Sequence, residues 1–353
     1  MELQEGNGSP GPRPGTAWTE PGGVGDHASV IVCAFTSERL EQTVECVNSV
    51  LRQRPHPGEV IVVVDHNEWL EAELRSRLPE LVTVVANRSE RGLSSARNTA
   101  VKLSRHDVVV FVDDDAIPHE RWLERLLAPF ADPSVAGVGG HALATWEDVQ
   151  PSWFPDELLW VVGCSYRGLP SAGPVRNPLG CNMAFRADTF SRVGLFDPAI
   201  GRLGTRPLGC EETEFCVRVA RELGAQLVLM PGAAVDHRVP QNRGTPMYLL
   251  RRCYYEGISK ALVRKLGDVT SLDTERVYVR RTLIRSVTSN LGKALSGPGR
   301  ASALGRAAAV IAAVGAAATG YLVGAVYYRL RPPAASPPKL TPPVVQVDLI
   351  NRS

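Results

Sequence analysis

The sequence predicts an α/β protein with a doubly wound, mostly parallel sheet, and three observations favour this class. Short runs of β-forming residues alternate with stretches of helical periodicity between residues 28 and 112. The runs are mostly apolar, which is typical of strands buried on both faces of a parallel sheet. Two of the runs end in carboxylates, at Asp65 and Asp113, on the edge where open α/β sheets bind ligands.

The expected elements follow one another in β-α-β order. We expect strands at residues 28–34, 59–65, 81–86 and 108–112, and helices at residues 38–52, 68–78 and 92–103. Later in the chain we expect a helix at residues 118–130, a strand at 135–140, a helix opening at 211, a strand at 227–230 and a helix at 247–266.

Composition narrows the class of protein. The chain has 353 residues, of which 44% are hydrophobic and 22% charged, and its net charge is +2. These values indicate a globular protein with a large core and give no argument for nucleic-acid binding. The seven cysteines form no C-x-x-C pair, so we expect reduced thiols and a cytoplasmic protein. No apolar stretch near the N-terminus predicts a signal peptide.

Asp113, Asp114 and Asp115 follow the apolar strand without interruption. Three neighbouring carboxylates are costly to ionise together unless a cation neutralises them. Hard divalent cations bind carboxylate oxygens and often take substrate phosphates as further ligands. The triplet therefore predicts a metal–diphosphate site, and the alternative is a solvated turn.

The segment Arg91-Gly-Leu-Ser-Ser-Ala-Arg-Asn98 lies where a loop turns into a helix. Free N–H groups at a helix N-terminus attract anions, and Arg97 adds a forked cation toward a phosphate. The alternative is an ordinary capped helix.

Taken together, these motifs resemble the inverting family 2 glycosyltransferases of GT-A fold, over about residues 28–265. The resemblance implies an enzyme that takes a sugar from a nucleotide-diphosphate donor. It implies that Asp65 contacts the base or ribose and that Arg97, Asn98 and Asp114 line the donor. Asp113 and Asp115 resemble the D-x-D pair that holds Mn²⁺ or Mg²⁺. The chain departs from the family at Asp65-His-Asn67, where many members have Asp-Asp-Gly-Ser, so the base preference stays open.

Two downstream motifs extend the resemblance. Asn182, in Gly180-Cys-Asn-Met-Ala-Phe-Arg186, stands where the family flanks the donor sugar, and the alternative is a turn cap. Glu211 and Glu212 stand where the family has a Glu-Asp pair and uses the Asp as catalytic base. We therefore expect Glu212 to be the base, with Glu211 as second candidate, because a carboxylate must reach the acceptor hydroxyl. The alternative is plain capping of a helix N-terminus.

His237 follows the strand expected at 227–230 and resembles the histidine that can complete the metal shell of the family. The alternative is a structural histidine. Arg243, Arg251 and Arg252 come next. They can clamp the diphosphate or face an anionic lipid surface, and the sequence leaves both open.

Composition at the two ends and the resemblance between them divide the chain into segments. These are a disordered tail (1–27), a nucleotide-sugar-binding half (28–142), an acceptor-binding and catalytic half (143–240), C-terminal helices (241–299), a hydrophobic helix (300–330) and a Pro-rich tail (331–353). Residues 141–177 concentrate aromatic side chains, which either pack a loop-rich region or form a wall facing sugar or lipid.

The 22 residues from 307 to 328 carry no charge, enough for a helix to span the apolar core of a bilayer. Gly320-x-x-x-Gly324 provides a small-residue face for close helix packing. We expect membrane association through 307–328, at the cytoplasmic face, and the alternative is a buried or self-associating helix.

The expected function is transfer of a sugar to an acceptor hydroxyl or phosphate with inversion, in cell-surface glycan or glycolipid synthesis. The partners are a nucleotide-diphosphate sugar and a glycan or lipid-linked acceptor, without nucleic acid. One alternative is a nucleotidyltransferase, but Phe35-Thr-Ser-Glu38 is not the Gly- and Arg/Lys-rich loop that such enzymes need. Another is a non-catalytic nucleotide-sugar-binding scaffold subunit at a membrane.

Overall fold

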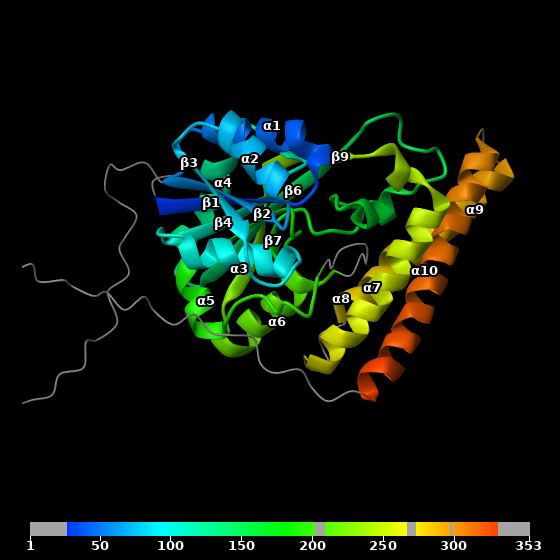
Figure 1. Cartoon of the computed structure of the whole chain (residues 1–353). Helices are drawn as coiled ribbons and strands as arrows, with labels where there is room; N and C mark the ends of the chain where they lie inside the picture. Colours follow the sequence, from blue (N-terminus) through cyan, green and yellow to red (C-terminus); the bar gives the residue numbers. More distant parts are fainter. Residues whose placement is uncertain (1–26, 202–208, 267–272, 297–298, 331–353) are drawn as a thin grey trace, which may run out of the picture.

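The computed structural model describes residues 27–201, 209–266, 273–296 and 299–330. Helices cover both faces of a curled sheet, and a group of C-terminal helices lies along one side of it (Figure 1). The strand order is β3-β2-β1-β4-β8-β6-β9-β5. The predicted α/β class with a mostly parallel sheet and C-terminal helices is confirmed. The predicted tails lie outside the described residues, apart from residue 27.

The first half of the sheet has the predicted β-α-β order. Its parallel strands are β1 (Ala28–Ala34), β2 (Glu59–Asp65), β3 (Val82–Asn87) and β4 (Val108–Asp113). The helices between them are α1 (Leu40–Leu51), α2 (Glu68–Arg77) and α3 (Leu93–Leu103). The strand order reverses at β1, which lies between β2 and β4. In sheets of this kind, ligands bind at the carboxyl ends of the strands beside that reversal.

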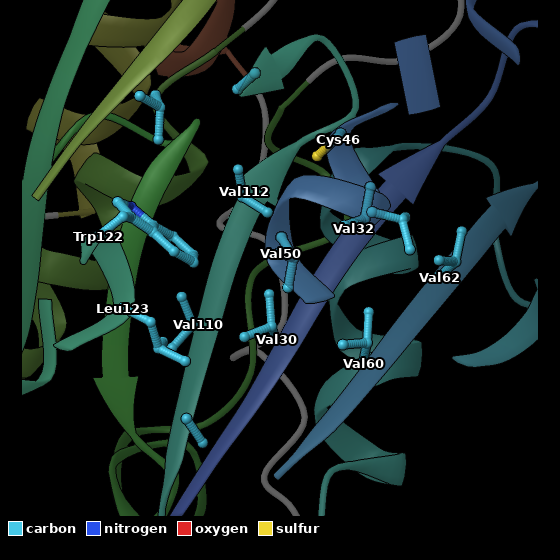
Figure 2. Packing of buried hydrophobic residues seen from close by; sticks show 14 of the residues in the cluster. Val30, Val32, Cys46, Val50, Val60, Val62, Val110, Val112, Trp122 and Leu123 are labelled. Atoms are coloured by element: carbon cyan, nitrogen blue, oxygen red, sulfur yellow. The ribbon is translucent and has the colours of Figure 1, made fainter. Parts of the chain in front are cut away.

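Alternate valines of three strands form one face of the core (Figure 2). These valines pack against helix α1 and helix α4 (Trp122–Leu127). Figure 2 labels Val30, Val32, Val60, Val62, Val110, Val112, Cys46, Val50, Trp122 and Leu123. Burial of one such aliphatic side chain stabilises the fold by roughly 1.5–3 kcal/mol. The ends of β2 and β4 are thus anchored on a rigid base.

The second half of the sheet is mixed. Strand β8 (Asn182–Arg186) runs antiparallel to β4 and to β6 (Val135–Trp146), and β6 pairs in parallel with β9 (Gln226–Val239). Both β6 and β9 are longer than predicted. The register shifts between Gly140 and Ala142, and a Cβ on Gly140 would lie 1.8 Å from the carbonyl oxygen of Ala233. Glycine therefore allows the two strands to remain paired beyond the shift.

The single helix predicted at residues 118–130 is wrong. The structure has a short strand β5 (Ala116–Pro118), which pairs antiparallel with β9, followed by α4 and the 3-10 helix η3 (Ala128–Ala131). Proline at the start of η3 removes a backbone donor, which explains why the α-helix ends there. The remaining helices of this half are α5 (Ala187–Val193) and α6 (Glu211–Leu223).

The aromatic-rich segment 141–177 packs against the C-terminal helices. It contains the 3-10 helix η4 (Asp156–Val162) and the short strand β7 (Gly173–Pro174). Phe154 is buried, and its ring meets that of Trp146 edge to face at a centroid distance of 5.6 Å. Both residues pack with the hydrophobic cluster that includes residues of α10 (Arg300–Arg329). For these two aromatics the geometry supports the packing interpretation.

Helix α10 lies along α7 (Pro246–Leu266) at the edge of the molecule (Figure 1). A Cβ on Gly320 would lie 1.9 Å from the carbonyl oxygen of Tyr254, and one on Gly257 would lie 2.0 Å from that of Ala317. The predicted small-residue face thus packs backbone against backbone within one chain. Along the chain, α7 and α10 are connected by α8 (Asp273–Tyr278), the π-helical turn η7 (Val279–Leu283) and α9 (Ile284–Ser296).

Candidate active site

The acidic triplet lies at the carboxyl end of β4. Asp113 closes the strand, and its side chain is 29% exposed, whereas the side chains of Asp114 and Asp115 are only 4% and 3% exposed. Because β4 is buried on both faces and β5 begins at Ala116, the triplet is held in a short turn between two strands. A solvated turn would expose all three carboxylates, so this burial favours a site.

Strand β9 brings His237 to the triplet. In the antiparallel β5–β9 pair, His237 lies opposite Ala116, and the Arg238 N–H donates to the carbonyl oxygen of Asp115 at 2.9 Å. Ligand atoms of Asp113, Asp115 and His237 all lie within 4.8 Å of one another. Two carboxylates and an imidazole at this separation fit Mn²⁺, and the carboxylates alone suit Mg²⁺. These donors are therefore suited to hold the predicted cation.

Arginines balance the charge of the triplet. One guanidinium nitrogen of Arg39 lies 2.8 Å from a carboxylate oxygen of Asp114 and 2.8 Å from one of Asp115. Arg243 is buried and lies 3.8 Å from Asp115. Burial raises the pKa of Asp114 to about 7, with the neighbouring aspartates adding to the rise and Arg39 opposing it. Oδ2 of Asp114 is also buried and has no hydrogen-bond partner among the described residues.

Arg97 connects the triplet to the acids of α6. Its side chain is 2% exposed, and it donates to Glu211 Oε1 at 3.0 Å and to the carbonyl oxygen of Gly180 at 2.8 Å. The same guanidinium lies 3.6 Å from Asp113. Arg97 is thus surrounded by its partners inside the protein, and a direct contact with a donor phosphate stays a prediction.

Glu212 faces the same region. A Cβ on Gly180 would lie 3.3 Å from Arg97 Nη2 and 3.8 Å from Glu212 Oε2. Burial, together with the charges of Glu211 and Glu256, raises the pKa of Glu212 to about 7. A carboxylate with a pKa near the working pH is well suited to accept a proton. The geometry thus brings the predicted base close to the guanidinium that contacts Asp113.

Asp65 lies at the end of β2, two strands from the triplet. Its Oδ2 accepts from the backbone N–H of Gly92 at 3.0 Å, and its Oδ1 accepts from the Asn87 amide at 2.7 Å. The first bond attaches Asp65 to the N-cap of α3, the helix that contains Arg97, and the second attaches it to the end of β3. Its predicted contact with base or ribose stays a prediction.

The two predicted asparagines are used inside the protein. Asn98 donates to the carbonyl oxygen of Phe196 at 2.8 Å and accepts from its N–H at 3.0 Å. Asn182 accepts from the Trp122 indole at 2.9 Å and donates to the carbonyl oxygens of His141 and Ala233. Asn182 is fully buried and Asn98 is 5% exposed. The geometry gives both side chains a structural role, and donor contacts by them stay predictions.

A charged network on α7 was not predicted from the sequence. Glu256 accepts from Arg252 at 2.9 Å and from the Cys210 thiol at 3.2 Å, and it lies 3.3 Å from Lys260. Burial opposes ionisation of Glu256, but Lys260 and Arg252 lower its pKa to about 2. The i, i+4 spacing of Arg252, Glu256 and Lys260 was the available signal. The role of Arg39, by contrast, has no signal in the sequence, because its partner Asp114 is 75 residues away.

The comparisons with known proteins agree with this geometry. The sequence profile described as Glycosyl transferase family 2 matches residues 29–194. The chain is also 31% identical over 300 residues to the glucosyl-dolichyl phosphate glucuronosyltransferase of Haloferax volcanii, covering 84% of this chain and 95% of that protein. The chain belongs to glycosyltransferase family 2. It is therefore an enzyme that uses a nucleotide-sugar donor.

Two further similarities accompany this assignment. The glycosyltransferase is 26% identical to succinoglycan biosynthesis protein ExoM of Rhizobium meliloti, over 65% of this chain and 73% of that protein. Its fold is similar to that of mannosyltransferase PcManGT from Pyrobaculum calidifontis, with a TM-score of 0.52 and 19% identity over 86% and 87% of the two chains. The structural similarity supports the predicted GT-A fold.

Proposed function

We propose that this glycosyltransferase moves a sugar from a nucleoside-diphosphate donor to an acceptor in one displacement that inverts the anomeric configuration. Glu212 accepts the proton of the acceptor hydroxyl as the hydroxyl oxygen attacks the anomeric carbon. The bond to the diphosphate breaks on the opposite side. The observation that carries this proposal is the convergence of Asp113, Asp115 and His237 with Glu212, through Arg97 and Gly180.

Asp113, Asp115 and His237 would hold Mn²⁺ or Mg²⁺ at the diphosphate. A bound divalent cation would neutralise the negative charge that develops on the leaving group. Arg39 and Arg243 already contribute positive charge at the same place. The solved PcManGT complex contains GDP-Man and Mn²⁺, which is in keeping with this assignment. Asp65, at the end of β2 two strands away, is the proposed contact for the nucleoside.

The proposed acceptor is a lipid-linked glycan at the cytoplasmic face of a membrane. Two observations support it. The name of the Haloferax relative specifies glucosyl-dolichyl phosphate. Helix α10 is long and apolar enough to cross a membrane, and an 18-residue window of it has a mean hydropathy of 1.9. Since one face of α10 packs closely on α7, we propose that α10 lies at the membrane surface rather than being surrounded by lipid.

The metal site is tested by Asp115→Asn, with Asp236→Asn as the matched control. Asp236 is the sequence neighbour of His237 and pairs with His119 instead, with a side chain that is 47% exposed. We expect Asp115→Asn to abolish Mn²⁺ binding, followed by electron paramagnetic resonance, and to abolish release of nucleoside diphosphate from a panel of nucleotide sugars. Asp236→Asn should retain both. Unchanged Mn²⁺ binding and turnover in Asp115→Asn would overturn the metal assignment.

The stereochemistry needs its own measurement. Nuclear magnetic resonance of the product should show an anomeric configuration opposite to that of the donor. Retention of configuration would exclude the single displacement, whatever the metal result. Replacement of the base by Glu212→Gln should lower turnover by about 10²–10⁴-fold while leaving Mn²⁺ binding intact.

A further inference from the structure

A cavity of about 620 Å³ lies among the C-terminal helices. Its walls come from η4 and the loops beside it, from η7 and α9, and from Arg306 of α10. None of the candidate active-site residues lines it. Five cationic side chains and two acidic ones do, so its charge is positive.

Two of these cations are already held in place. Arg167 lies 2.8 Å from Asp156 and 3.3 Å from Glu157, so it is neutralised by the two acids of the wall. Arg306 donates to Asn290 Oδ1 at 3.0 Å and to the carbonyl oxygen of Ser152 at 2.7 Å. These contacts connect the three walls and give the cavity a defined shape.

The other three cations are Arg281, Arg285 and Lys293. They lie four and eight residues apart, so they share one side of the η7–α9 helix, together with Ser289. All three are exposed, and none forms an ion pair with an acid in the part of the chain that the structure describes. Three like charges in one cavity repel one another unless an anion binds between them.

The chemistry of the cavity selects the class of anion. Guanidinium and ammonium groups bind phosphate oxygens with charge-assisted hydrogen bonds. Thr282, Ser286 and Ser289 place hydroxyl groups on the same wall, and these can donate to further phosphate oxygens. The cavity therefore suits a phosphate group with an attached polar substituent.

An apolar surface beside the cavity indicates where that phosphate comes from. On α9, Ile284, Leu291 and Leu295 are 54%, 43% and 82% exposed. They recur with spacings of seven and four residues, so they form a stripe next to the one that carries Arg285 and Lys293. Exposed apolar side chains next to cations are typical of helices that lie in a membrane interface.

Helix α10 continues this apolar surface. Ile311, Leu322 and Val326 are 58%, 65% and 62% exposed and lie on one side of the helix, whereas Gly320 faces α7. In Figure 1, α9 and α10 lie at the outer edge of the molecule, away from the sheet. No charged residue interrupts α10 between Ala307 and Tyr328.

We propose that the cavity binds the phosphate headgroup of an anionic phospholipid while the exposed apolar residues of α9 and α10 enter the adjoining acyl layer. The protein would thus recognise an anionic membrane surface through a specific phosphate-binding cavity, in addition to the contact that its exposed apolar residues make with lipid. This proposal rests on the membrane association proposed above, but not on the donor, the cation or the base.

Vesicle flotation tests it with a matched pair of variants. The triple variant Arg281→Gln, Arg285→Gln and Lys293→Gln removes the cavity cations. The control Arg280→Gln, Arg300→Gln and Arg329→Gln removes the same charge from exposed positions of the same helical group that do not line the cavity. Each protein is mixed with vesicles of phosphatidylcholine alone, or of phosphatidylcholine with phosphatidylglycerol.

We expect the parent to prefer the phosphatidylglycerol vesicles. The cavity variant should lose about a hundredfold in affinity for them, since one basic residue near an anionic surface contributes roughly fivefold. The loss of affinity in the control should be at least about tenfold smaller than that in the cavity variant. Equal losses in the two variants would mean diffuse electrostatic attraction and would overturn the site, as would a parent with no preference between the vesicles.

Inorganic phosphate distinguishes a soluble ligand from a lipid. Titration calorimetry with sodium phosphate measures whether the cavity takes the free anion. Phosphate binding that the cavity variant abolishes, with vesicle binding unaffected by the same variant, would overturn the lipid source. Donor turnover with a soluble acceptor should be unchanged in both triple variants, so failure of this proposal is distinguishable from failure of the proposed function.

Discussion

Protonation of Glu212 should control the rate in the neutral pH range. With a pKa of about 7, its ionised fraction falls from about nine-tenths at pH 8 to about one-eleventh at pH 6, so turnover should fall about tenfold. An ordinary glutamate would remain ionised over this range, and the rate would be flat. The assay is release of nucleoside diphosphate at saturating donor, with Mn²⁺ binding measured at each pH.

Glu256→Gln tests the structural cause of this titration. The negative charge of Glu256 raises the pKa of Glu212, and Glu256 also neutralises Arg252 and Lys260. Its removal takes away a repelling charge and leaves two cations without that partner, and both effects lower the pKa of Glu212. The acid limb of the pH–rate profile should therefore move to lower pH.

Stability provides an independent reading of the same group. A carboxyl whose pKa is raised by folding favours the folded state at low pH, and this contribution is lost as the pH rises through the folded pKa. Glu212→Gln should therefore be more stable than the parent at pH 8, on the order of 1–3 kcal/mol, and similar to it at pH 4. A flat rate profile, an unmoved limb in Glu256→Gln and equal stabilities at pH 8 would together refute this account of the base.

Two further predictions concern the framework of the site. Glu214→Gln should lower the free energy of unfolding by about 3–5 kcal/mol in urea titrations. The reason is that Arg218 is buried and lies 2.5 Å from Glu214, so the variant leaves a buried charge without its partner. A loss below about 1 kcal/mol would contradict this prediction. Gly320→Ala should loosen α10 and speed its proteolysis, since the new Cβ would lie 1.9 Å from the Tyr254 carbonyl oxygen. Its control is Gly315→Ala, which meets nothing within 4 Å, and equal proteolysis of the two variants would exclude the packing role.

The strands of the first half could be predicted from the sequence because their signal is local. Strands β1 and β2 have the predicted bounds, since each contains an unbroken apolar run, at residues 30–34 in β1 and 60–64 in β2. The lengths of β6 and β9 could not be predicted, because their pairing continues past a register shift that needs Gly140 beside Ala233. The antiparallel position of β8 depends on partners that lie far away in sequence.

In the candidate site, too, local motifs could be predicted and contacts between distant residues could not. The metal group of Asp113, Asp115 and His237 was predicted as a set, from a motif and a resemblance, and the structure brings the three together. The surroundings that decide how these acids ionise were not predicted. Arg39 and Glu256 affect the site across 75 and 44 residues of chain, respectively, and only the fold reveals such pairs.

Helix α7 lies between the proposed base and α10, so a truncation that removes α10 can affect both membrane binding and catalysis. One side of it supplies Glu256 beside the proposed base, and another side receives the glycine face of α10. A truncation before residue 300 would therefore uncover α7 as well as delete the apolar helix. Lost activity in such a truncation would be ambiguous between detachment from lipid and distortion of the base, whereas polar substitutions at Ile311 and Leu322 change the outward surface alone.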